Sequence, residues 1–330
     1  MNIAVIGAGS WGTAFGRYLS LQGHRVRVFG RNPDKIRLIN QTHQNSEYLP
    51  GIELPPDMVF SSRIEEVVAE ADLLINAISS QYIREQYGAF KDVIAKDLPI
   101  INLSKGIELR SLKLIHQVFR EIYPDNPYAA LSGPSHAEEV AIDMPTTLVV
   151  ASADEDLAHL VQSLSSRSIR IYRSNDLLGV ETGGALKNII ALAVGVSDGI
   201  GFGDNTQAAI MTRGMAEIMR MGAMLGAKTE TFLGLSGFGD LIVTCTSRHS
   251  RNRRCGRLIG QGMSVKQATE QVGMVVEGIR TMEAAQALAN QLGIDMPLTK
   301  ALYDIIHEGA SIADTIIELM ERDYKREFIL

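Results

Sequence analysis

The stretch "IAVIGAGSWGTAF", residues 3–15, decides the fold. Four apolar residues typical of a buried strand run into glycines at Gly7, Gly9 and Gly12, and a helical pattern follows. This is the G-x-G-x-x-G arrangement of dinucleotide-binding βαβ units. In such a unit Gly7 permits the tight turn, Gly9 lets the backbone approach a pyrophosphate at the helix N-terminus, and Gly12 allows close helix–strand packing. A tight turn that binds nothing is the alternative.

The rest of the first half repeats this alternation of strand and helix. Apolar runs rich in Val, Ile and Leu occupy residues 2–7, 25–30, 72–79, 99–106, 128–135, 146–153 and 168–174. Segments with helical spacing separate most of them, such as Ile64, Val67 and Val68. The pattern predicts an α/β fold, with an open, doubly wound, mostly parallel sheet of Rossmann type and helices on both faces.

After about Ser174 the apolar period changes from strand-like to helical, as in Leu186, Ile189 and Ile190. We therefore predict two domains, a dinucleotide-binding domain over residues 1–176 and an all-helical substrate domain over 177–330. A chain of 330 residues with 45% hydrophobic residues is long enough to bury two such cores.

Composition excludes several function classes. No apolar run reaches 18 residues and Met1 leads directly into a strand pattern, which predicts no membrane span, no secretory signal and a cytoplasmic protein. Cys245 and Cys255 are the two cysteines and the seven histidines are scattered, so we expect no disulfide framework and no metal site. The net charge of −6 argues against a nucleic-acid partner.

The end of the second strand bears on the choice of dinucleotide. An acidic residue there would bind the adenosine ribose of NAD, but this chain has "VFGRNP". Arg31 is suited to the 2′-phosphate of NADP, with Asn32 as a second donor. A solvated arginine, or use of both NADP and NAD, fits the residues as well. Trp11, inside the glycine turn, either lines the cofactor groove or simply packs.

Two lysines are candidates for the chemistry. Lys105 in "NLSKG", and the turn from Gly133 through Ser135 to Ala137 in "SGPSHA", follow strands whose carboxyl ends face the ligand in such folds. Lys187, followed by Asn188, interrupts an otherwise apolar helix. Burial there lowers the pKa of a lysine toward the range of general acid–base catalysis. Each lysine has an alternative, surface exposure for the first and snorkelling to water for the second.

The segment "GLSGFGDLIVTCTSRHSRNRRCGRLIGQG", residues 234–262, combines a glycine-rich approach to Asp240 with a concentration of positive charge. Five arginines lie within ten positions, at 248, 251, 253, 254 and 257. Arginine binds phosphate in bidentate geometry, and the segment lacks the aromatic residues that stack on RNA bases. A phosphorylated small-molecule substrate fits better than a solvated basic loop or an RNA-binding patch.

Six motifs in order resemble the bacterial-type NAD(P)-dependent glycerol-3-phosphate dehydrogenases along essentially the whole chain. They are "GAGSWGTA", "LSKGIE", "LSGPSHAEEVA", "ALKNIIALAVGVSDG", "GLSGFGDLIVTCTSRHSRNRR" and "VVEGIRT". The resemblance implies a Rossmann domain joined to a helical substrate domain, a homodimer, and NADP or NAD as cofactor. It also implies interconversion of dihydroxyacetone phosphate and sn-glycerol 3-phosphate for phospholipid synthesis.

The resemblance further implies roles for individual residues. Lys187 would be the proton acceptor during oxidation. Substrate would be held by Lys105, Gly133, Ser135, Lys187, Asn188, Asp240, Ser250, Arg251 and Asn252, with Thr244 a weaker candidate. The cofactor would contact Gly7, Gly9, Ser10, Trp11, Gly12, Arg31, Lys105, Ala137, Arg251, Val275 and Glu277. Family members carry His or Arg at the position of Arg31, so this residue does not decide between NADPH and NADH.

Two other functions share part of this pattern. A Rossmann-plus-helical dehydrogenase acting on a hydroxy acid or ketopantoate would share the first motif, but "RHSRNRR" and "SGPSHAEE" argue against it. A non-catalytic NADP-sensing module would not need Lys105, Lys187, Asn188 and Asp240 together.

Overall fold

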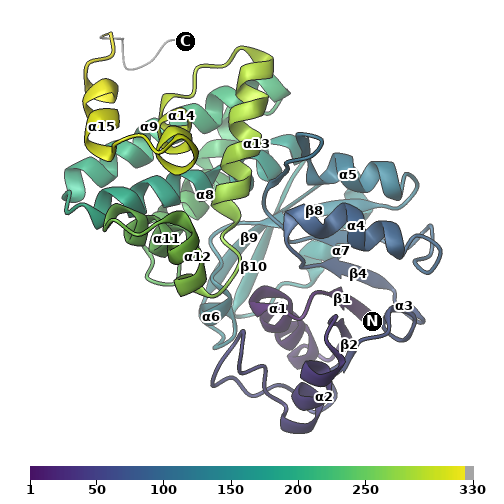
Figure 1. Cartoon of the computed structure of the whole chain (residues 1–330). Coiled ribbons are helices and arrows are strands. Elements are labelled where there is room, and N and C mark those ends of the chain that lie inside the picture. Colours follow the sequence, from purple (N-terminus) through teal and green to yellow (C-terminus); the bar gives the residue numbers. More distant parts are fainter. Residues whose placement is uncertain (324–330) are drawn as a thin grey trace.

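One eight-stranded sheet organises the first half of the chain in the computed structural model, which describes residues 1–323. Its strand order is β10-β9-β8-β5-β4-β1-β2-β3 (Figure 1). The strands are β1 (Asn2–Ile6), β2 (Arg25–Phe29), β3 (Val59–Ser61), β4 (Leu73–Asn76), β5 (Ile100–Asn102), β8 (Tyr128–Ser132), β9 (Thr146–Ser152) and β10 (Ile169–Ser174). Only the β8–β9 pairing is antiparallel. The predicted mostly parallel α/β sheet is therefore confirmed.

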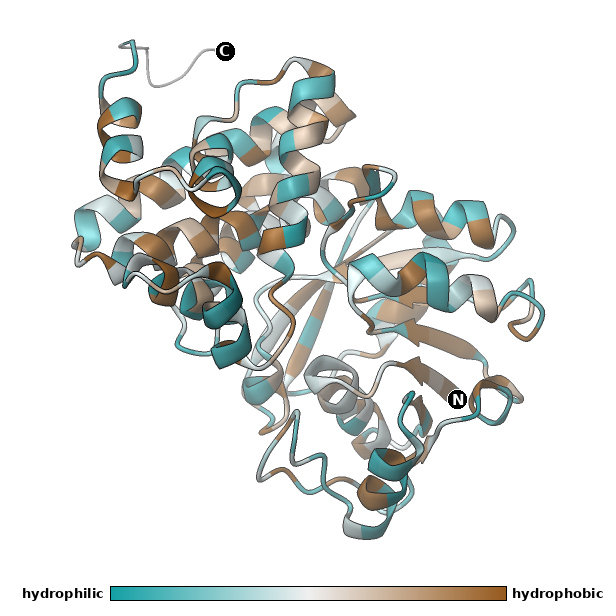
Figure 2. Ribbon diagram, in the orientation of Figure 1, coloured by the Kyte–Doolittle hydropathy of each residue, from teal (hydrophilic) through white to brown (hydrophobic). Residues whose placement is uncertain are grey.

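Both faces of this sheet are buried, because the strand residues alternate between two apolar cores. In β1, Ile3 and Val5 belong to one core, while Ala4 and Ile6 belong to the other. The first core includes residues of α1 (Ser10–Leu21), α2 (Pro33–Thr42), α6 (Ala137–Val140) and α7 (Glu155–Ser163). The second includes residues of α3 (Ile64–Val68), α4 (Ile83–Ala89) and α5 (Ile115–Ile122). Figure 2 shows brown strands between helices that have one brown and one teal face.

Helices make up the second half, as predicted, and gather at one end of the sheet (Figure 1). They include α8 (Leu177–Gly199), α9 (Asp204–Leu225), α10 (Asp240–Thr246), α11 (Arg251–Gly260), α12 (Val265–Val272), α13 (Glu277–Leu292), α14 (Pro297–Tyr303) and α15 (Ile312–Met320). By length and composition alone α8 could cross a membrane, but 83% of its apolar window is buried inside the protein. It is the central helix of this half.

Close backbone contact joins α8 to α11. A Cβ atom at Gly195 would lie 2.2 Å from the Arg253 carbonyl oxygen, and one at Gly256 would lie 2.0 Å from the Leu192 carbonyl oxygen. Glycine is therefore required at both positions. The two helices can approach this closely because neither presents a side chain there, and this contact fixes α8 relative to the segment that precedes α11.

The last strand ends at Ser174 and α8 begins at Leu177, close to the predicted domain boundary. The two cores are nevertheless not separated cleanly by sequence. A small hairpin of β6 (Ile107–Glu108) and β7 (Lys113–Leu114) inserts Ile107 and Leu114 into the apolar core of the helical half. Residues 324–330 of the predicted helical domain lie outside the described residues.

Candidate functional site

A cleft of ≈ 980 Å³ lies between the sheet and the helical half, and residues of both halves line it. Of the residues predicted for the site, those that line it are Gly7, Gly9, Ser10, Trp11, Arg31, Lys105, Ser135, Ala137, Lys187, Asn188, Thr244, Ser250, Arg251, Asn252, Val275 and Glu277. Gly12, Gly133 and Asp240 do not line it and lie directly behind residues that do. The cleft therefore collects positions separated by up to 270 residues of sequence.

The glycine turn at one end of the cleft has the geometry that a pyrophosphate needs. Gly7 has φ +122°, a conformation that side chains rarely permit. A Cβ atom at Gly12 would lie 1.9 Å from the Gly7 carbonyl oxygen, so Gly12 lets helix α1 close onto the turn. Gly9 precedes α1 without a side-chain cap, and nothing lies within 4 Å of where its Cβ would be. The exposed N-terminus of α1 thus fits a dinucleotide phosphate.

Trp11 and Ser10 connect this turn to the rest of the cleft. The Trp11 indole donates a hydrogen bond to the Ser135 carbonyl oxygen at 3.1 Å, which joins the glycine turn to the "SGPSHA" turn. The Ser10 hydroxyl lies 3.9 Å from the sulfur of Met274 in the helical half. Trp11 therefore both lines the groove and packs, edge-on against Phe15.

The position expected to recognise the adenosine end is also open to the cleft. The Arg31 guanidinium carbon lies 5.9 Å from the centre of the Tyr82 ring. Tyr82 follows β4 and is half exposed, and it also lines the cleft. The side-chain oxygen of Asn32 accepts hydrogen bonds from the backbone N–H groups of Asp34 and Lys35, so Asn32 is primarily the N-cap of α2.

Lys187 lies at the inner end of the cleft, in contact with two residues of α10. Its Nζ donates to Asp240 Oδ1 and, at 2.7 Å, to the Thr244 hydroxyl. The Thr244 hydroxyl in turn donates to the Asp240 carbonyl oxygen at 2.6 Å. A π-helical turn, η3 (Leu235–Gly239), leads into Asp240. The glycine-rich approach noted in the sequence therefore shapes the start of α10.

Lys105 approaches the same carboxylate from the sheet. Its Nζ donates to Asp240 Oδ2 at 2.5 Å and to the Gly133 carbonyl oxygen at 3.1 Å. Lys105 and Gly133 follow β5 and β8, which are parallel neighbours, so their carboxyl ends meet at this edge. A Cβ atom at Gly184 on α8 would lie 2.9 Å from the Ser132 hydroxyl oxygen, so glycine at this position lets α8 pack closely against the end of β8.

Burial and charge set the protonation of this cluster. Burial lowers the pKa of Lys187 to about 7, against the opposing attraction of Asp240, and the charge of Lys105 lowers it further. Burial alone would raise the pKa of Asp240, but the two neighbouring ammonium groups outweigh it and lower that pKa. Asp240 is therefore ionised at neutral pH, while Lys187 can hold or release a proton. Asp240, with a side chain only 1% exposed, acts behind the lysines and does not face the cleft.

The remaining predicted residues form two small hydrogen-bond networks. Asn252 donates to the Asn188 side-chain oxygen at 2.9 Å and accepts from the backbone N–H of Gly278 at 2.9 Å. Ser250 caps α11 by accepting from the Arg253 backbone N–H at 3.2 Å. The Glu277 carboxylate accepts from the Ser80 hydroxyl at 2.8 Å, and burial raises its pKa. These bonds fix the side of the cleft that the helical half supplies.

The five arginines of the basic segment do not gather around the cleft. Of its five arginines, only Arg251 lines the cleft. Arg253 pairs with Asp198 at 3.0 Å on the other side of α11, and Arg248, Arg254 and Arg257 are exposed. Consecutive residues of a helix point in different directions, so clustering in sequence does not become clustering in space.

Sequence reasoning did not single out His136, His249 or Tyr82, all of which line the cleft. The two histidines lie inside motifs that were already noted, "SGPSHA" and "RHSRN". Each histidine is adjacent in sequence to a predicted site residue, Ser135 or Ser250, and this adjacency could have identified both. Tyr82 is not adjacent in sequence to any predicted site residue, so the sequence did not point to it.

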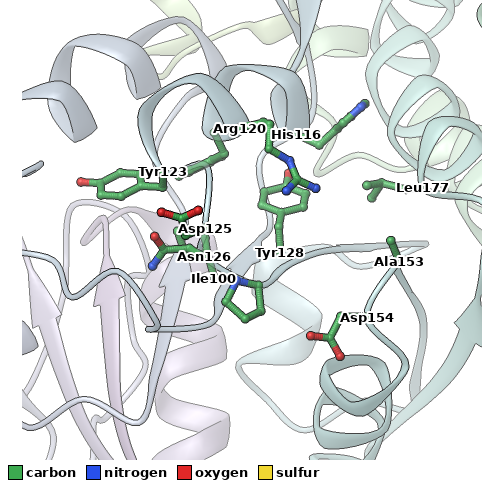
Figure 3. Close-up of a pocket in the computed structure, with 12 residues that line it drawn as sticks. Ile100, His116, Arg120, Tyr123, Asp125, Asn126, Tyr128, Ala153, Asp154 and Leu177 are labelled. Carbon is green, nitrogen blue, oxygen red and sulfur yellow. The ribbon is translucent and has the colours of Figure 1, made fainter.

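A second cavity, of ≈ 280 Å³, lies at the amino-terminal ends of β5 and β8 (Figure 3). Its polar side chains already serve the fold. Arg120 donates to the Pro124 carbonyl oxygen, Asn126 to the carbonyl oxygens of Ala95 and Leu98, and Asp154 caps α7. The Tyr128 hydroxyl donates to Glu181 at 2.5 Å. This cavity is therefore not the candidate functional site.

Comparisons with known proteins agree with the site. Residues 2–158 match the family described as NAD-dependent glycerol-3-phosphate dehydrogenase N-terminus, and residues 176–317 match the corresponding C-terminus. Proteins called glycerol-3-phosphate dehydrogenase [NAD(P)+] are similar to this chain. That of Shouchella clausii is 49% identical over 331 residues, covering 99% of this chain and 97% of the relative. The protein from Clostridium tetani is 48% identical over 327 residues, covering 99% of this chain and 94% of the relative.

Solved structures give the same result. A crystal structure of glycerol-3-phosphate dehydrogenase from Coxiella burnetii superposes with a TM-score of 0.94 at 34% identity, covering 97% of this chain and 98% of that one. A ketopantoate reductase from Ralstonia eutropha, at 17% identity and a TM-score of 0.62, shares the fold alone. The cleft, its glycine turn, the two lysines that share the buried Asp240 carboxylate and these matches establish that the chain belongs to the NAD-dependent glycerol-3-phosphate dehydrogenase family.

Proposed function

We propose that this chain interconverts dihydroxyacetone phosphate and sn-glycerol 3-phosphate, with NADPH or NADH as the hydride carrier. The observation that carries the proposal is the buried Asp240 carboxylate held between Lys105 and Lys187 at the inner end of the cleft. Such a cluster supplies a proton-transfer group of suitable pKa beside a cation that can hold an anionic substrate.

The cofactor residues proposed are those of the glycine turn, Arg31, and the residues of both halves that line the outer cleft. When bound, the nicotinamide supplies hydride in one direction and accepts it in the other. Arg31 is available to bind a 2′-phosphate, and Tyr82 offers a flat surface beside it. The division into domains at residues 176 and 177 is also a proposal, supported by the change from strands to helices.

Lys187 is the proposed proton-transfer residue. With a pKa of about 7 it is present near neutral pH both as ammonium and as amine. As ammonium it protonates the ketone oxygen during reduction, and as amine it removes the hydroxyl proton during oxidation. Asp240 and Thr244 orient its Nζ. Lys105, Ser135, Asn188, Ser250, Arg251 and Asn252 are proposed to hold substrate.

Initial rates with dihydroxyacetone phosphate, measured separately with NADPH and NADH at the nicotinamide absorbance band, test the proposal. Turnover with at least one cofactor is expected, and far less with ketopantoate. Cofactor binding without turnover of dihydroxyacetone phosphate would instead indicate a sensing module. Faster turnover of ketopantoate would indicate the other dehydrogenase class.

We further propose that the enzyme supplies the glycerol phosphate backbone of phospholipids, in the cytoplasm and as a homodimer. These statements rest on the family to which the chain belongs. Sedimentation tests the dimer. Rescue of a depleted strain by glycerol 3-phosphate tests the lipid role, and a strain that needs no such supplement would contradict it.

A further inference from the structure

Two histidines from the two halves of the chain face each other across the cleft. His136 lies between Ser135 and Ala137, after β8, and His249 directly precedes Ser250 at the start of α11. Their ring centres are 5.9 Å apart and the ring planes are inclined by 48°. Both line the cleft, next to the residues proposed to hold substrate.

Their hydrogen bonds assign a hydrogen to one nitrogen of each ring. His136 Nε2 lies 3.4 Å from the Val243 carbonyl oxygen, which can only accept, so this nitrogen carries the hydrogen. Its Nδ1 is then the acceptor of the neutral ring. His249 Nε2 accepts from Arg248 Nε at 3.4 Å, because a guanidinium only donates, and its Nδ1 therefore carries the hydrogen. His249 Nδ1 is therefore a donor, whereas His136 Nδ1 can take up a proton.

The surroundings of His136 favour its neutral form. Burial lowers its pKa, and the positive charge of Lys187 on α8 lowers it further. The opposing influences are weaker. They come from the Val243 carbonyl oxygen and Asp240 on α10, and from Glu138 on α6. On the side of α11, His136 faces His249, which is flanked by Arg248.

A phosphate dianion entering this part of the cleft would reverse that balance, because a nearby negative charge favours the imidazolium form. We infer that His136 and His249 form part of the substrate's phosphate site, with His249 donating from Nδ1 and His136 taking up one proton from solvent as the dianion binds. This inference rests on the proposed function, since it needs a phosphorylated substrate. No covalent bond changes in the step.

Linkage gives the sign of the effect. If binding takes up a proton, affinity for a dianion falls as pH rises through the pKa of His136 in the complex, by at most about tenfold per pH unit. Lys187 also loses charge near pH 7 and weakens anion binding in the same direction. The contribution of His136 must therefore be obtained by difference from a variant that cannot take up a proton there.

Sulfate is the probe, because it remains a dianion from about pH 6 to about pH 8, where His titrates. Its dissociation constant is measured through the fluorescence of Trp11, the single tryptophan, whose indole binds the carbonyl oxygen of Ser135 next to His136. The readout does not need turnover. The variants are His136→Gln, whose amide can keep the donor to Val243, and His249→Gln. His159→Gln, altered at an exposed site beside Arg173, is the matched control.

In wild type the dissociation constant should rise roughly tenfold or more from about pH 6 to about pH 8. His136→Gln should reduce this rise to roughly two- to threefold, and His249→Gln should weaken binding at every pH by roughly three- to tenfold while keeping the rise. The control should behave as wild type. An undiminished rise in His136→Gln, or no sulfate binding in wild type, would overturn the inference. If the predicted sulfate results hold but dihydroxyacetone phosphate is not reduced, the proposed function fails and the dianion site stands.

Discussion

Replacing Asp240 by asparagine removes the carboxylate that holds Lys105 and Lys187 together. An asparagine side chain offers one acceptor oxygen where the carboxylate offers two, and its NH₂ group would face the other ammonium. Because Asp240 is only 1% exposed, water cannot take its place easily. Two cations would then share a buried site.

The consequence for Lys187 can be worked out from its surroundings. Its pKa is about 7 with the carboxylate present, and both the charge of Asp240 and its hydrogen bond raise that pKa. Without this charge and hydrogen bond the pKa of Lys187 falls. At a pH above that pKa, each unit of decrease reduces the fraction of Lys187 in the ammonium form about tenfold, equivalent to ~1.4 kcal/mol. Ketone reduction needs the ammonium form, so a pKa lower by at least about one unit should reduce turnover at about pH 7.5 at least roughly tenfold. Breaking a buried ion pair also costs about 3 to 5 kcal/mol of folding free energy.

The assay is the pH dependence of kcat for dihydroxyacetone phosphate reduction at saturating cofactor, with thermal unfolding measured alongside. In wild type the rate should be lost as pH rises through about 7, the pKa of Lys187. In Asp240→Asn this loss should begin at least about one pH unit lower. Oxidation of glycerol 3-phosphate, which needs the amine, should suffer less. Asp198→Asn, which disrupts the pair with Arg253 outside the cleft, is the matched control. An unshifted profile with nearly normal turnover would refute the reasoning.

Three further substitutions test other parts of the structure. Arg31→Glu should raise KM for NADPH at least about tenfold more than KM for NADH, because repulsion replaces a charge-assisted bond; equal effects would remove Arg31 from the 2′-phosphate site. Arg251→Lys should lower kcat/KM for dihydroxyacetone phosphate and Arg251→Ala should lower it more, by about 1.5 to 3 kcal/mol. The preference over unphosphorylated dihydroxyacetone should shrink in the Ala variant, and an unchanged ratio would place the phosphate elsewhere. Gly195→Ala, whose Cβ would lie 2.2 Å from the Arg253 carbonyl oxygen, should destabilise folding by about 1 to 3 kcal/mol. Gly88→Ala in α4 is the matched control and should not destabilise folding, because no atom lies within 4 Å of the added Cβ. Equal unfolding temperatures for the Gly195→Ala and Gly88→Ala variants would contradict the close packing of α8 and α11.

Local patterns predicted most of the sheet because its strands are apolar on both faces. The direction of β9 could not be read from them. The connection from β8 to β9 contains only the four-residue helix α6, too little for the crossover that a parallel pair requires. The chain therefore returns antiparallel. Strand β3 escaped prediction because Phe60 is its only buried residue.

Local patterns predicted the site at the glycine turn and at a residue that conflicts with its neighbours. Lys187 stands out because it interrupts an apolar helix, and its lowered pKa follows from that burial. Its contact with Asp240, 53 residues away, depends on how α8 packs against α10, which no local pattern gives. The pairing of His136 with His249 depends in the same way on the approach of the two halves. The glycines at 195, 199, 256 and 260 do carry a sequence signal, two small-residue pairs four apart, for the contact between α8 and α11.

The central claim is that Lys187 transfers the proton during reduction of dihydroxyacetone phosphate. The most direct test is kcat of Lys187→Ala with saturating dihydroxyacetone phosphate and NADPH, with cofactor affinity and thermal unfolding measured on the same sample. We predict a loss of roughly 10²- to 10⁴-fold in kcat while NADPH still binds and the fold persists. A folded variant that keeps most of its turnover would contradict the claim.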